Sequence, residues 1–144
     1  MVRIKDSLQQ KLLDNQVHYE REEILWMLDY IGHPDYKIRD ELIFVTLARV
    51  IQEQLFTKEQ FDFVVIEALK RQGLLYKKEE VGQATLTRSF TALLLANLLH
   101  ADAKKNSLYF KRLSSQQRMA LFEQGMSYLL YENDRTGYSE EYGW

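Results

Sequence analysis

Apolar residues recur along this chain at the spacing of an α-helix. Phe61, Val64, Val65, Ala68 and Leu69 follow i, i+3, i+4, i+7 and i+8, which is the stripe that an amphipathic helix buries. The same spacing occurs near both ends of the chain, at Ile4, Leu8 and Leu12 and at Met119, Phe122, Met126 and Leu129. No segment alternates apolar and polar residues for long, so the pattern predicts an all-α protein of about six helices without strands.

Local signals mark where several of these helices begin. Thr57-x-x-Gln60 and Ser114-x-x-Gln117 are capping boxes placed just before apolar runs. The single proline stands in His33-Pro34-Asp35, where Pro34 cannot continue a helix and Asp35 can cap the next one. Gly32 precedes this tripeptide, and we expect it to close the preceding helix in the left-handed conformation.

The tripeptide His33-Pro34-Asp35 also occurs in the J-domain of co-chaperones, between two helices. In that family the helix before the tripeptide is markedly basic, whereas here the sequence YEREEILWMLDYIG is mainly acidic. We therefore interpret the tripeptide as a helix start in a scaffold.

Two apolar segments resemble each other at a separation of 48 residues: VTLARVI at 45–51 and LLLANLL at 93–99. This separation approximates the period of HEAT repeats, which are pairs of antiparallel helices. The second helix of such a repeat typically opens with an acidic residue, a branched apolar residue and Arg, as in Asp35-Tyr36-Lys37-Ile38-Arg39; Thr87-Arg88 matches only in part. We therefore expect a right-handed superhelix of antiparallel hairpins, a HEAT- or armadillo-like α-solenoid.

This reading divides one domain, residues 1–144, into four parts. They are a capping helix at 1–16, a first hairpin at 20–54, a second hairpin at 57–104, and the start of a third hairpin at 114–144 that is expected to be cut short. Stacked hairpins share one core because no single hairpin can bury its apolar face alone.

Three segments together resemble a known family. GHPDYKIRDELIFVTLARVI, LTRSFTALLLANLL and NDRTGYSEEYGW, in this order, are similar to an uncharacterised bacterial domain-of-unknown-function family, over roughly residues 22–144. The resemblance implies a HEAT-like helical solenoid and a chain that continues into further helices. It brings no catalytic residues to this sequence.

Composition narrows the function classes. The chain has 144 residues and a formal net charge of −2, which gives no overall attraction to nucleic acid or to an anionic membrane. It has no cysteine, so disulfides and thiolate chemistry are excluded. The N-terminus lacks the apolar region of a signal peptide, and the longest apolar block, ALLLANLL at 92–99, is too short to span a bilayer. We expect a cytoplasmic protein.

The residues that usually carry chemistry form no motif. His18, His33 and His100 lack partners at helical spacing, so no metal site and no cofactor is expected. A glycine-rich phosphate loop and a nucleophile elbow are both missing from the sequence. An enzyme is therefore not the expected class, although a small-molecule-processing enzyme stays open as an alternative, as does a DNA-binding solenoid of the repair type.

The preferred function is a module that binds an unidentified protein or peptide on the concave face lined by second helices. Arg39, Arg49 and Arg88 are the candidate residues on that face, although a ladder of ion pairs between neighbouring repeats would also suit Arg39 and Arg88. Near the C-terminus the candidates are Tyr138, Tyr142 and Trp144, as a recognition surface or as packing against a following hairpin. If the end of the stack is uncapped, we expect a homodimer through the C-terminal helices.

Overall fold

The computed structural model describes residues 2–14, 18–73, 76–77 and 82–131, apart from the side chains of residues 2, 83 and 129–131. These residues form six helices and no strand, which confirms the all-α prediction and the expected number of helices. The bounds are α1 Val2–Leu13, α2 Arg21–Asp29, one continuous helix made of α3 Tyr36–Ile38, η1 Arg39–Phe44 and α4 Val45–Gln52, then α5 Lys58–Arg71, α6 Gln83–Ala103 and α7 Ser115–Tyr131.

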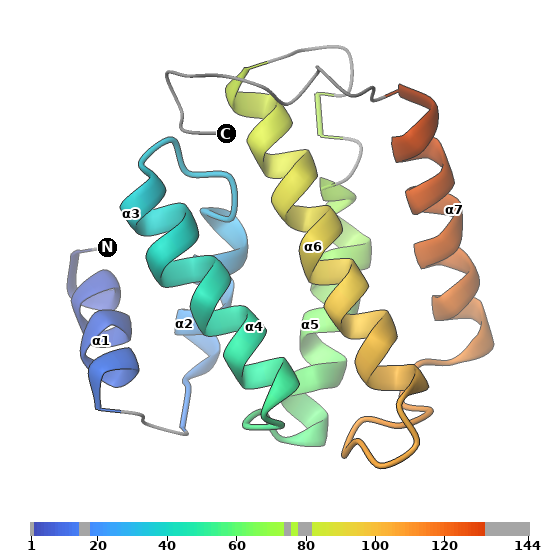
Figure 1. Cartoon of the computed structure of the whole chain (residues 1–144), viewed down its shortest axis with the longest axis horizontal. Helices are drawn as coiled ribbons and strands as arrows, with labels where there is room; N and C mark the ends of the chain where they lie inside the picture. The colour runs from blue at the N-terminus through green and yellow to red at the C-terminus, as the bar shows by residue number, and fades with distance from the viewer. Residues whose placement is uncertain (1, 15–17, 74–75, 78–81, 132–144) are drawn as a thin grey trace.

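The helices lie in two layers, with one further helix beside them at each end (Figure 1). α2 packs against α5, and α4 packs against α6. At one end α1 contacts α2 and η1; at the other, α7 contacts α5 and α6. We call α2 with the helix at 36–52 the first hairpin, and α5 with α6 the second hairpin. A single cluster of buried apolar side chains runs through both hairpins.

Most of the predicted helix starts are present in the structure. Thr57 and Gln60 form a reciprocal capping box at α5, and Ser114 and Gln117 make the same pair of hydrogen bonds at α7. Asp35 accepts a hydrogen bond from the Lys37 N–H at 2.9 Å, as expected of an N-cap. These contacts form between residues two or three apart, so the local sequence is sufficient to predict them.

The backbone differs from the sequence-based expectations at two places, Gly32 and the segment Arg39–Phe44. Gly32 does not adopt the left-handed conformation; the described residues with positive φ include Gln72, which ends α5, and Gly82, which precedes α6. The π-helical segment η1, inside the first hairpin, was not predicted. Its wider turn lies where buried Arg39 enters the core.

The end helices present opposite kinds of surface. On α1 the exposed residues include Arg3, Asp6, Gln9 and Gln10. On α7 three residues of the predicted apolar stripe, Met119, Phe122 and Met126, are exposed rather than buried, and Leu121 faces the core instead. Helical spacing shows which residues share a face, but it does not show which face the neighbouring helices cover.

Buried polar contacts attach α1 and the segment before α7 to the two layers. Glu23 accepts hydrogen bonds from Ser7 at 2.8 Å, from Lys11 at 2.6 Å and from the Glu20 N–H at 2.7 Å. Burial by itself raises the pKa of Glu23, but these hydrogen bonds outweigh burial and hold the pKa below its usual value. They therefore join α1 to α2 through a carboxylate that stays ionised.

The segment between α6 and α7 is held in a similar way. Tyr109 stacks on Phe61 with ring centroids 4.3 Å apart, and its hydroxyl donates to the Phe56 carbonyl at 2.7 Å. Burial raises the pKa of Tyr109 to about 12. Buried Asp102 accepts hydrogen bonds from the Leu113 N–H at 2.8 Å and from Arg118 at 2.7 Å. This segment therefore fixes the start of α7 against α6.

Candidate functional site

The two hairpins place their turns at the same end of the molecule, on either side of α6. The first turn comprises residues 30–35. The second turn follows α5, and the structure describes its residues 72, 73, 76 and 77. Each first helix ends just before its turn: the Tyr30 N–H donates to the Trp26 carbonyl, and the Gln72 N–H donates to the Ala68 carbonyl.

Arg39 donates hydrogen bonds to the first turn from its buried side. Its side chain is 0% exposed, and its guanidinium group pairs with Asp40 through Nε at 2.8 Å and Nη2 at 3.1 Å. Nη1 donates to the His33 carbonyl at 3.3 Å, with the Pro34 carbonyl at 3.5 Å. The guanidinium carbon also lies 5.2 Å from the centre of the Phe90 ring on α6. A buried charge thus joins the first turn, its own helix and the second hairpin.

Arg88 holds the second turn in a related way. It is 1% exposed, and its Nη1 donates to the Tyr76 carbonyl at 2.8 Å and to the Lys77 carbonyl at 2.6 Å. Its Nη2 donates to the hydroxyl of Thr85 at 3.0 Å. Both arginines therefore supply donors to turn carbonyls that belong to their own hairpin, and such charge-assisted bonds are stronger than neutral ones.

Two glycines let the turns approach α6 closely. A Cβ atom added at Gly32 would lie 2.5 Å from the backbone nitrogen of Thr87 and 2.6 Å from its Cα, so no side chain fits there. A Cβ atom at Gly73 would lie 2.5 Å from the hydroxyl oxygen of Thr91. Gly32 is therefore needed for close packing between hairpins, not for a left-handed turn.

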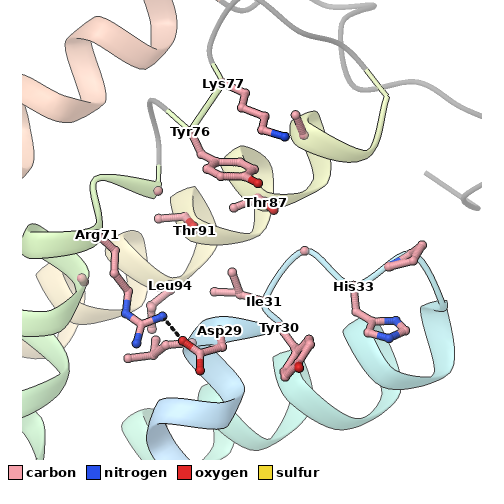
Figure 2. A pocket seen from close by; sticks show the side chains of 16 residues that line it. Asp29, Tyr30, Ile31, His33, Arg71, Tyr76, Lys77, Thr87, Thr91 and Leu94 are labelled. Atoms are coloured by element: carbon pink, nitrogen blue, oxygen red, sulfur yellow. Dashed lines mark hydrogen bonds and ion pairs between the residues drawn. The ribbon is translucent and has the colours of Figure 1, made fainter.

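Between the two turns lies a cleft of about 1210 Å³ (Figure 2). Its floor is one face of α6, made by Ala84, Thr87, Thr91 and Leu94. The first wall comes from the end of α2 and the first turn, the second from the end of α5 and the second turn; the wall residues are Leu28, Asp29, Tyr30, Ile31, Gly32, His33, Pro34, Ala68, Arg71, Gly73, Tyr76 and Lys77.

An ion pair connects the two walls. Arg71 Nη1 lies 2.5 Å from Asp29 Oδ1, and Figure 2 shows this pair at the Leu94 end of the floor. Arg71 also bonds to Glu67, one turn earlier on α5, at 3.4 Å. Tyr76 and Lys77 lie over the other part of the floor, near Thr87. The cleft therefore combines an apolar floor carrying two hydroxyls with a rim of mixed charge.

The side chains that line the cleft offer hydrogen bonding and apolar contact. Across the part of the chain that the structure describes, no cluster of three or more His, Asp or Glu residues could hold a metal ion. The polar lining groups are hydroxyls, the imidazole of His33 and the carboxylate of Asp29 on the first wall, and the cations of Arg71 and Lys77 on the second wall. Such a surface is suited to recognising a ligand that has both polar and apolar groups.

The predicted site residues lie in three different places. Arg39 and Arg88 are buried beneath the turns, and Arg39 forms an ion pair with Asp40 in its own helix. Arg49 is partly buried on α4 and donates to the hydroxyl of Tyr19 at 2.6 Å. Tyr138, Tyr142 and Trp144 lie outside the described residues.

Sequence reasoning missed the residues that line the cleft. Asp29 and Arg71 are 42 positions apart, and neither belongs to a recognisable motif. The available signal was the pair Gly32 and Gly73, each of which follows the first helix of a hairpin. A glycine that is not in a left-handed turn indicates close backbone approach, and both glycines approach the helix that forms the floor.

A domain of unknown function, DUF2785, is found at residues 74–144. The match includes α6, α7 and the NDRTGYSEEYGW segment, but it begins well after residue 22, where the resemblance was expected to start. No curated protein and no solved structure matches the chain. Within the described ranges, no helix has the length and apolar character needed to cross a membrane.

Proposed function

We propose that this chain is a HEAT-like helical-repeat module that binds an extended segment of a partner protein in the cleft between its two turns. The observation that carries the proposal is the pairing of two arginine-held turns across one face of α6. Arg39 holds the turn that supplies His33, and Arg88 holds the turn that supplies Tyr76 and Lys77. Both walls are thus fixed before a ligand arrives, which lowers the entropic cost of binding.

The repeat interpretation is supported by the equivalence of the two hairpins. In each hairpin a glycine follows the first helix, and an arginine near the start of the second helix donates to turn carbonyls. α2 and α5 pack side by side, as do α4 and α6, as expected for stacked hairpins of a solenoid. In this proposal Arg39 and Arg88 are positioning residues rather than contact residues.

The dimensions of the floor favour a peptide as ligand. From Ala84 to Leu94 the helix advances about 15 Å, which is the length of about four or five residues of an extended chain. Ala84 and Leu94 lie at the two ends of the floor with Thr87 and Thr91 between them; Thr87 is partly exposed, whereas the other three are 4–8% exposed and offer only a narrow contact. An extended peptide presents side chains and backbone polar groups at this spacing.

The charge on the rim disfavours a polyanion. Arg71 faces Asp29 at 2.5 Å, so one of the two cations of the cleft is already neutralised. Nucleic-acid grooves normally carry an excess of Lys and Arg along their length. A protein segment of mixed composition fits this rim better than a phosphate backbone does.

The test begins with selection of peptides from a displayed random library on the full 144-residue chain. Selected peptides are then titrated by fluorescence anisotropy against the unaltered protein, Tyr76→Ala and His33→Ala. Loss of either wall residue should weaken binding at least tenfold, because each removes contact area from one wall. Tyr36→Ala is the matched control: Tyr36 and Tyr76 are 48% and 44% exposed, but Tyr36 does not line the cleft.

The control should bind as well as the unaltered protein. Equal affinity of all variants would place binding outside the cleft, and failure to select any peptide would refute peptide recognition. Circular dichroism of each variant verifies that an affinity change is not loss of the fold.

A further inference from the structure

The second surface of interest is the outward face of α7. Met119, Phe122 and Met126 are 63%, 62% and 60% exposed, although they form one continuous apolar stripe. At the opposite end of the two layers, the corresponding surface of α1 carries Arg3 and Asp6. A terminal helix normally presents such a polar surface to water. The apolar stripe on α7 therefore indicates a surface that is covered in the working protein.

The spacing of the stripe residues indicates that the element covering them is another helix. Positions 119, 122 and 126 follow the three-then-four pattern by which one helix packs along another, and Leu129 continues this pattern in the sequence. Gly125 lies beside Met126, and a Cβ atom there would meet nothing within 4 Å. Glycine inside a helix costs about 0.5–1 kcal/mol relative to alanine. No contact of the described residues requires Gly125, whereas close approach of another helix would.

We infer that a second copy of this chain covers the stripe, with α7 packed against α7 of its partner. The charge of the surface permits this. The charged residues of α7 are Arg118 and Glu123, and the guanidinium group of Arg118 is already paired with Asp102 at 2.7 Å. Two copies can therefore approach with little repulsion, and the same apolar stripe serves both sides of a symmetric interface.

The area available predicts how strong this association is. A fully covered aromatic side chain buries about 200 Å². With a similar area taken for the two methionines, the three stripe residues, which are 60–63% exposed, offer about 120 Å² each. Both copies together contribute roughly 700 Å² from the stripe, below the 1,200–2,000 Å² of standard stable interfaces. The dimer should therefore be weak and reversible, and its population should depend on protein concentration.

Sedimentation velocity over a concentration series, from micromolar to near millimolar, tests this inference. The unaltered chain should shift from monomer to dimer, and Phe122→Glu should lose the dimer at every concentration. Gln9→Glu is the control: it adds the same charge to an exposed position on α1, at the opposite end of the two layers, and it should dimerise normally. A chain that stays monomeric, or equal loss in both variants, would overturn the inference.

Methionine oxidation by dilute peroxide, with mass spectrometry as the readout, distinguishes the ways in which the stripe could be covered. In a dimer, oxidation of Met119 and Met126 should slow as protein concentration rises, while buried Met27 stays protected throughout. Protection of both at all concentrations would mean that residues 132–144 of the same chain cover the stripe. Rapid oxidation at all concentrations would mean that the stripe is uncovered. Both of these results contradict a second copy.

Discussion

Arg39 gives the sharpest test of how the first turn is held. The substitution Arg39→Met keeps a flexible apolar side chain of similar length but removes every guanidinium donor. The side chain is 0% exposed, so water cannot replace the lost donors without entering the core. The His33 carbonyl and the Asp40 carboxylate would each lose a hydrogen-bond partner.

The size of the effect follows from the contacts that are lost. The hydrogen bond to the turn carbonyl involves a charged donor and contributes about 1.5–3 kcal/mol. The pair with Asp40 contributes less, about 1 kcal/mol, because that carboxylate is 37% exposed and can be solvated. The contact with the Phe90 ring adds about 0.5–1 kcal/mol. Burying Met instead of a cation offsets part of the sum, which leaves a net loss of about 3 kcal/mol.

Urea unfolding followed by circular dichroism measures this loss directly, and the melting temperature should fall by about 10 °C. Arg3→Met is the matched control, since Arg3 is 74% exposed and pairs with Glu22 on the surface; it should change stability by less than about 0.5 kcal/mol. If Arg39→Met were as stable as the control, Arg39 would not hold the first turn, and the proposed role of Arg88 would lose its parallel.

Four further outcomes are expected. Gly32→Ala should destabilise the protein by more than Gly73→Ala, because the added methyl group meets the backbone of Thr87 at Gly32 but only the side chain of Thr91 at Gly73; comparable urea midpoints would contradict this. Glu23→Gln should reduce the loss of folding stability at acid pH. Because folding lowers the pKa of Glu23, the contribution of this carboxylate to stability is complete above the ordinary pKa of 4.5 and is lost as the pH falls below that value. Tyr109→Phe should flatten the alkaline limb, because folding raises the pKa of Tyr109 from 10.0 to about 12, and its contribution is lost as the pH rises through this interval; absorbance of the phenolate and circular dichroism follow the two events together. Duplex DNA titrated at low salt should form no saturable complex, and a micromolar complex with a steep salt dependence would show that the cleft or another face binds nucleic acid.

The sequence alone was sufficient to locate the starts of the helices at Tyr36, Lys58 and Ser115. The capping pair of Thr57 and Gln60, and the cap of Asp35, join residues at most three positions apart. Such contacts form within one turn of helix, so they can be read from adjacent letters of the sequence. The absence of strand patterns likewise predicted the all-α fold.

The candidate site could be predicted only in part. Arg39 and Arg88 were singled out by their positions ahead of two similar segments, and their expected places were an open binding face or a ladder of ion pairs between repeats. Both arginines are buried in the structure, where they donate hydrogen bonds to the carbonyl groups of the turns above them. Such buried carbonyl groups need a hydrogen-bond donor. Their connection with the cleft is indirect, through the walls that they hold.

Whether a residue faces a neighbouring helix or water was decided by the tertiary structure. The same helical periodicity describes Phe61, which is buried, and Phe122, which is 62% exposed, because α7 covers α5 while no described helix lies beyond α7. Gly32 meets Thr87 across 55 positions of sequence, and Asp29 meets Arg71 across 42. A pattern of neighbouring residues contains the period of each helix but not the distances between helices, and those distances alone bring the two turns together over α6 to form the cleft.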